Sequence, residues 1–223
     1  MNVRMKRQGG FTLIELVIVV AIIAALAAMA FAIPRWRVRN ASVDASAAEM
    51  VVRLAGLRST ALTDGVDRIF VFADADPSAG RDATAFILSN PGPTWTLAGF
   101  NPAQPSLNLG AGGAVDETVL PRNLRRLTTA SGFAPRPLHE ARLNDSQMLG
   151  SCGSVGCFAI RYTGDGEVWG EKPDGSLYGR QAPDAPGFGF VLARAEDDGS
   201  SPAAKRRAVV IGFPTGVVKS YSP

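Results

Sequence analysis

The longest apolar stretch of the chain lies near its start, in an almost unbroken run from Phe11 to Ile33. Only Thr12 and Glu15 interrupt this run. As an α-helix it would be about 34 Å long at ~1.5 Å per residue, which is enough to cross a hydrocarbon core of roughly 30 Å. Because a single span in lipid has to satisfy its own backbone hydrogen bonds, the pattern predicts a transmembrane helix over residues 11–33.

The pattern beyond Pro34 is that of an amphipathic helix. Proline lacks a backbone donor and so ends or kinks the first helix, and Asp64-Gly65 is a typical C-terminal stop. Apolar residues recur at helical spacing on one side, which only Arg58 interrupts, and polar residues fall on the other. The apolar positions are Ala47, Ala48, Val51, Leu54, Ala55, Ala61 and Leu62, and the polar ones are Glu49, Arg53, Gly56, Thr60 and Asp64. We predict a helix over residues 34–65 whose apolar face packs on the protein's own sheet.

From Asp67 onward the period becomes that of extended strands. Short runs rich in β-branched and aromatic residues alternate with turns that contain Asp, Gly and Pro. The predicted strands are 68–73, 84–89, 94–98, 118–120, 158–162, 167–169, 188–193, 209–213 and 216–219. Residues 101–114 and 128–150 are expected to be surface insertions. The chain is therefore expected to be an α+β protein whose helix packs on an antiparallel β domain, residues 66–223.

The residues around the start of the apolar run form a distinctive motif. Glu15 places a carboxylate inside the predicted span, which costs about 3 kcal/mol unless something neutralises it. Upstream stand three basic residues and Gly9-Gly10, whose unhindered backbone a protease can grip. The sequence Gly10-Phe11-Thr12-Leu13-Ile14-Glu15 resembles the class III leader junction of type IV pilins and type II secretion pseudopilins.

This resemblance implies how the N-terminus is processed. A prepilin peptidase would remove residues 1–10 as a leader peptide, cutting between Gly10 and Phe11, and would methylate the new amine of Phe11. Glu15 would then guide filament assembly, and its presence would place the subunit below the outermost tip position. An ordinary signal peptide cleaved after Ala32 and a plain membrane anchor are the alternatives, and neither accounts for the glutamate four residues past the junction.

Shorter matches further along the chain are similar to FimT/FimU-type minor pilins and H-type (GspH) type II secretion pseudopilins. They are residues 57–62, 120–121, 162–166 and 213–217. The resemblance implies a pilin-like fold and a structural subunit that helps initiate a type IV pilus and is incorporated near its tip. The alternatives are an H-type pseudopilin of a type II secretion system and a DNA-binding minor pilin for DNA uptake.

The same resemblance implies the location and the partners. The precursor would lie in the inner membrane with its N-terminus cytoplasmic and its globular domain periplasmic, before it enters a pilus or pseudopilus. Its partners would be other minor pilins or pseudopilins, the major pilin, the prepilin peptidase and the inner-membrane assembly platform.

The charge of the chain disfavours a nucleic-acid partner. The net charge is +3, with 23 basic and 20 acidic residues. Arg4, Lys6 and Arg7 leave with the leader, so the remaining 20 basic groups balance the 20 acidic ones. Basic clusters at residues 122–126 and 205–207 could still contact phosphates if folding brought them together. The tail, residues 216–223, carries one lysine and no arginine.

The two cysteines, Cys152 and Cys157, are expected to form a disulfide in an exported domain, since Gly153 and Gly156 allow a tight loop. A metal site with His139 and a redox dithiol are the alternatives.

No cofactor, metal or catalytic residue is expected. The carboxylates of Asp74, Asp76 and Asp82 suggest a calcium loop, but Ala79 stands where an EF-hand has glycine and the final glutamate is missing. The glycine-rich segment 110–114 lacks the lysine of a phosphate loop, and no Gly-x-Ser-x-Gly occurs.

Overall fold

A computed structural model describes residues 13–31, 35–107, 109–121, 124–127, 141–180, 184–197 and 205–222. The chain divides into two compact units, residues 1–39 and 40–223. Helix α1 spans Leu13–Phe31, and helix α2 spans Arg35–Asp64. The end of α2 is the predicted one, because Gly65 adopts a left-handed conformation with φ 63°.

The buried face of α2 differs from the predicted one. The described side chains that α2 buries follow a regular spacing of three and four residues: Val43, Ala47, Met50, Leu54, Leu57 and Ala61. Ala48 and Ala55 are exposed, and Leu62 is 48% exposed. The helix carries two adjacent apolar stripes, and it buries the one that holds the large side chains of Met50 and Leu57. The predicted face wrongly combined part of each stripe.

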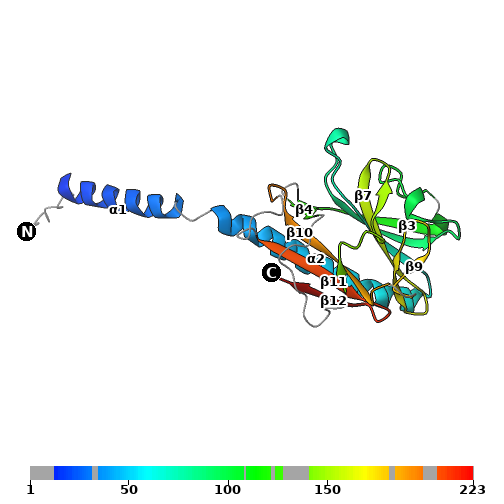
Figure 1. Ribbon diagram of the computed structural model, residues 1–223. Helices are drawn as coiled ribbons and strands as arrows, with labels where there is room; N and C mark the ends of the chain where they lie inside the picture. Colours follow the sequence, from blue (N-terminus) through cyan, green and yellow to red (C-terminus); the bar gives the residue numbers. More distant parts are fainter. Residues whose placement is uncertain are drawn as a thin grey trace, which may run out of the picture. The chain divides into compact units, whose positions relative to one another are not determined.

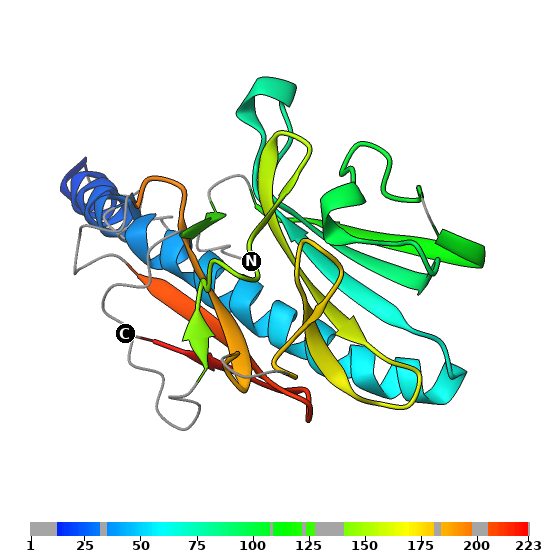
Figure 2. The same ribbon diagram turned by 45° about the vertical axis from the view of Figure 1, so that its right-hand side comes forward.

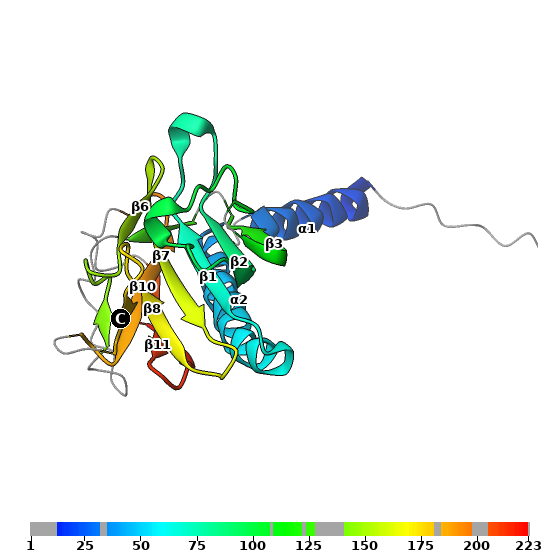
Figure 3. The same ribbon diagram turned by 90° about the vertical axis from the view of Figure 1, so that its right-hand side faces the viewer.

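The larger sheet has seven strands, and all of its pairings are antiparallel. Its order is β3-β2-β1-β7-β8-β9, with β6 pairing β7 beside this path (Figure 3). The strands are β1 Arg68–Ala73, β2 Thr84–Pro91, β3 Leu109–Val119, β6 Gly150–Cys152, β7 Val155–Tyr162, β8 Val168–Glu171 and β9 Leu177–Tyr178. Two short 3-10 helices, η1 Pro77–Ala79 and η2 Leu97–Gly99, lie in its connections.

The smaller sheet has five strands, ordered β12-β11-β10-β4, with β5 also pairing β10. The strands are β4 Leu124–Leu127, β5 Arg142–Leu143, β10 Gly187–Arg194, β11 Arg206–Gly212 and β12 Val217–Tyr221. The pairing of β5 with β10 is parallel and the others are antiparallel. The sequence predicted a β domain without dividing it, whereas the chain builds two sheets (Figure 1).

The main core lies where α2 meets both sheets. One cluster joins Leu54 and Leu57 of α2 to Phe158 of the larger sheet and Phe190 of the smaller one. The rings of Phe158 and Phe190 lie 4.8 Å apart between centroids. Figure 2 shows α2 passing behind both sheets, with the orange and red strands to one side and the cyan, green and yellow strands to the other. Helix α2 is therefore the common support of the two sheets.

A second apolar cluster covers the opposite face of the larger sheet. It joins Val71 and Phe86 of the sheet to Trp95 and Leu97, which lie in the connection before β3. Residues 94–98 were wrongly predicted to be a strand. Thr96 instead caps η2, accepting a hydrogen bond from the backbone N–H of Gly99 at 3.3 Å.

Strand β3 corrects a second prediction. Residues 101–114 were expected to be an insertion, but β3 begins at Leu109. The glycine-rich part is accommodated by a register shift against β2 between Ser89 and Pro91, and by Gly112 at φ 76°.

Candidate functional site

Glu15 is the one predicted processing or assembly residue that the structure describes. Gly10 and Phe11, the predicted cleavage and methylation residues, lie outside the described part of the chain. Glu15 is in the first turn of α1 and is exposed. A carboxylate in this turn is stabilised by the partial positive charge of the helix N-terminus. The helix thus presents a single acidic group beside its N-terminal end.

The described side chains of α1, residues 13–24, form an apolar surface around this glutamate. All of them are exposed, and the large apolar side chains range from 50% exposed for Val19 to 81% for Leu13. Continuous apolar surface of this kind marks an interaction site, because its exposure to water is unfavourable. Among the helices described, none has the combination of length and hydropathy required for a membrane span. A membrane crossing by residues 11–33 stays a prediction.

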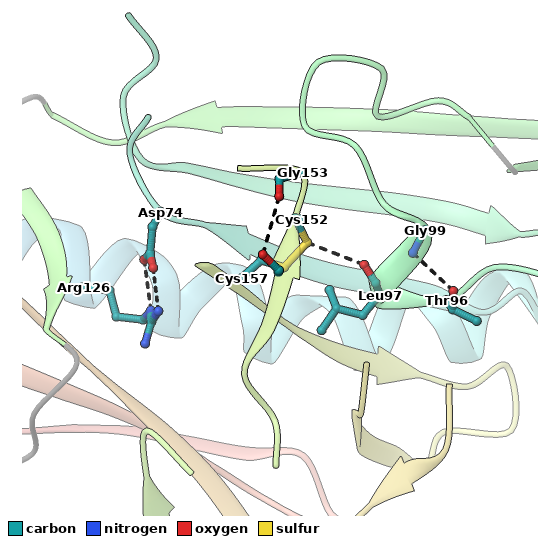
Figure 4. The surroundings of a disulfide bond; sticks show 9 residues. Asp74, Thr96, Leu97, Gly99, Arg126, Cys152, Gly153 and Cys157 are labelled. Atoms are coloured by element: carbon teal, nitrogen blue, oxygen red, sulfur yellow. Dashed lines mark hydrogen bonds and ion pairs between the residues drawn. A yellow bond between two sulfur atoms is a disulfide. The ribbon is translucent and has the colours of Figure 1, made fainter. Parts of the chain in front are cut away.

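The predicted disulfide joins Cys152 and Cys157 in the hairpin of β6 and β7 (Figure 4). The two Cα atoms are 5.8 Å apart, and Gly153 makes the turn at φ 66°. The Sγ atom of Cys152 lies 3.6 Å from the carbonyl oxygen of Leu97. Closing so short a loop stabilises the fold by about 2 kcal/mol, the low end of the usual range. The bond holds the hairpin over the outer face of the larger sheet.

The carboxylates of the suspected calcium loop are engaged by protein donors. Asp76 accepts hydrogen bonds from the hydroxyls of Ser154 at 2.6 Å and Ser78 at 2.5 Å, and from the backbone N–H of Ala79 at 3.2 Å. These bonds lower the pKa of Asp76 to about 2, and the bond from Ser154 has the largest effect. The described residues include no group of three or more potential metal ligands.

Asp74 forms a partly buried ion pair that links the two sheets, in which the side chain of Arg126 is 3% exposed and that of Asp74 is 26% exposed. Its carboxylate accepts from the Nε and Nη2 atoms of Arg126, at 3.0 and 2.5 Å (Figure 4). Asp74 follows β1 in the larger sheet, and Arg126 belongs to β4 in the smaller one. Burial raises the pKa of Asp74 despite the guanidinium beside it. The pair is not predictable from the sequence, because the partners are 52 residues apart.

The described members of the basic clusters are likewise held by acidic residues or carbonyl groups. Arg206 pairs with the carboxylate of Asp197 at 2.7 Å, and Arg125 donates to the carbonyl oxygen of the same residue. Lys205 and Arg207 both pair with Asp44 of α2. These contacts tie β11 and β4 to neighbouring segments. The basic side chains are thus already bound to groups of the protein, which disfavours their binding a phosphate.

Comparison with known proteins places a recognised motif over the start of the chain. Residues 5–31 match the prokaryotic N-terminal methylation motif. The searches of curated proteins and of solved structures each gave no match.

The motif supports a type IV pilin-like protein that takes part in the assembly of a pilus or pseudopilus. It also supports leader cleavage and methylation, a membrane-anchored precursor, and pilin assembly partners in general.

Proposed function

We propose that this protein is a minor pilin-like structural subunit that helps initiate a type IV pilus and is incorporated near its tip. The role is one of assembly and includes no catalysis. Before assembly the chain is anchored in the inner membrane by residues 11–33, with its N-terminus in the cytoplasm and the unit of residues 40–223 in the periplasm.

The observation that carries this proposal is the methylation motif at residues 5–31. A prepilin peptidase cleaves between Gly10 and Phe11, and the mature chain begins at a methylated Phe11. Cleavage creates an amine four residues before Glu15, so a cation and a carboxylate occupy one end of an apolar segment. In a filament, the carboxylate of one subunit sets the register by binding the amine of its neighbour.

The fold agrees with this role. Helix α2 supports two sheets through a continuous core, which gives the exported unit a rigid base. The contacts of Arg206 and Arg207 with Asp197 and Asp44 weigh against the DNA-binding alternative. An H-type pseudopilin shares the motif, and it remains the alternative that an experiment has to exclude.

Fractionation of cells tests the proposal. We expect the protein in sheared pilus fractions at a small fraction of the amount of major pilin, because a subunit near the tip is present in few copies. We also expect a deletion strain to form fewer pili while it secretes type II substrates normally. Normal piliation with defective secretion would instead identify the pseudopilin.

A further inference from the structure

The outer face of the larger sheet carries a groove that the proposed function does not use. Its volume is about 290 Å³, and it lies between the disulfide hairpin and the connection that follows η2. Phe86 of β2, Val119 of β3 and Val155 of β7 supply apolar walls. The groove is therefore able to receive the aliphatic part of a side chain.

The charged groups of the groove are mostly acidic. Four carboxylates line it, those of Asp74, Asp76, Asp82 and Glu117, against the single guanidinium of Arg81. Asp74 is balanced by Arg126, which leaves an excess of negative charge. Glu117 is exposed, and within the described chain its carboxylate has no hydrogen bond or ion pair. A cationic side chain complements this lining.

The strand that supplies Glu117 is also an edge of the sheet. Among the described strands, β3 pairs only with β2, so one row of its backbone N–H and C=O groups has no strand partner. The last six residues, Ala114 to Val119, run in regular register with β2. Asp116 faces α2, where Arg53 binds it at 3.3 Å, whereas Glu117 and Val119 face the groove. An edge of this length accepts an added strand.

We infer that the edge of β3 and the groove beside it form one binding site for an extended, basic segment of another polypeptide. The segment pairs with residues 114–119 as a further antiparallel or parallel strand. Alternate side chains then lie on the groove side, where a lysine or arginine next to Glu117 extends its aliphatic part along Val119. The proposed function does not depend on this site, so failure of the binding test would overturn the site alone.

Fluorescence anisotropy with a labelled peptide tests the site. The probe is a seven-residue peptide of alternating valine and lysine, and the protein is the full chain in neutral detergent micelles. We expect saturable binding below about 1 mM peptide. The Glu117→Gln variant should bind about threefold more weakly. The control Asp165→Asn, which alters an exposed carboxylate in the turn between β7 and β8, should bind as the unchanged protein does.

Two further probes separate the components of the site. The same peptide with alternate amides N-methylated cannot form the strand ladder and should not bind, and a valine-glutamate peptide should be repelled. Equal binding of the N-methylated peptide, or of the glutamate peptide, would overturn the inference. So would sedimentation showing a dimer of the full chain that Glu117→Arg dissociates, because a second copy would then be the occupant.

Discussion

Replacing Glu15 by valine is expected to leave membrane insertion and leader cleavage intact and to reduce incorporation into filaments by about tenfold or more. An apolar segment tolerates valine, so anchoring does not need the carboxylate. Assembly does need it under the proposed role, because the amine of a neighbouring subunit would otherwise be left in apolar surroundings without a counter-charge. That loss costs several kcal/mol, and each 1.4 kcal/mol is a factor of about ten.

The amounts of the variant in sheared-pilus and membrane fractions measure this effect. Glu49→Val is the matched control, since it removes an exposed glutamate from α2 without touching the motif. It should be recovered in filaments as the unchanged protein is. Equal recovery of the Glu15→Val variant in the filament fraction would show that the carboxylate does not guide assembly.

Replacing Asp74 by alanine is expected to lower the free energy of unfolding by about 3–5 kcal/mol. The side chain of Arg126 is only 3% exposed, so the variant leaves a guanidinium buried without its counter-charge. Asp116→Ala breaks another Asp–Arg pair, but the carboxylate of Asp116 is 64% exposed. This control should lose no more than about 1 kcal/mol.

Urea-induced unfolding of the full chain in detergent, followed by circular dichroism, measures both losses. The double variant Asp74→Ala, Arg126→Met should be more stable than Asp74→Ala alone, because it removes the buried charge as well as its partner. Similar losses for Asp74→Ala and Asp116→Ala, or no regain of stability in the double variant, would contradict this. Either result would show that the Asp74–Arg126 pair contributes no more to the free energy of unfolding than an exposed pair does.

Local patterns in the sequence predicted the parts of the fold that depend on neighbours along the chain. The bounds of α2 follow from Pro34 and Gly65, and β1 has the predicted limits because its residues form a continuous apolar run. The strand expected at residues 94–98 failed for a tertiary reason. Trp95 and Leu97 are residue types that are common in strands. They lie instead in the connection before β3 and are buried against the outer face of the larger sheet.

Features that depend on distant segments could not be predicted. Periodicity does not say which sheet a strand joins, so the division into two sheets was not foreseen. The partners of the basic cluster are also remote, since Asp44 lies 163 residues from Arg207. The hairpin disulfide, by contrast, was predictable because both cysteines and the turn glycine lie within a few residues of each other.

The N-terminus of the mature protein tests the account most directly. Mass spectrometry of the chain isolated from cells that contain a prepilin peptidase should find a first residue of Phe11 carrying one additional methyl group, and a Gly10→Val variant should keep its leader. A terminus after Ala32 would contradict a pilin-like N-terminus and would identify the segment as a signal peptide. An intact leader in the unchanged chain would identify it as a plain membrane anchor.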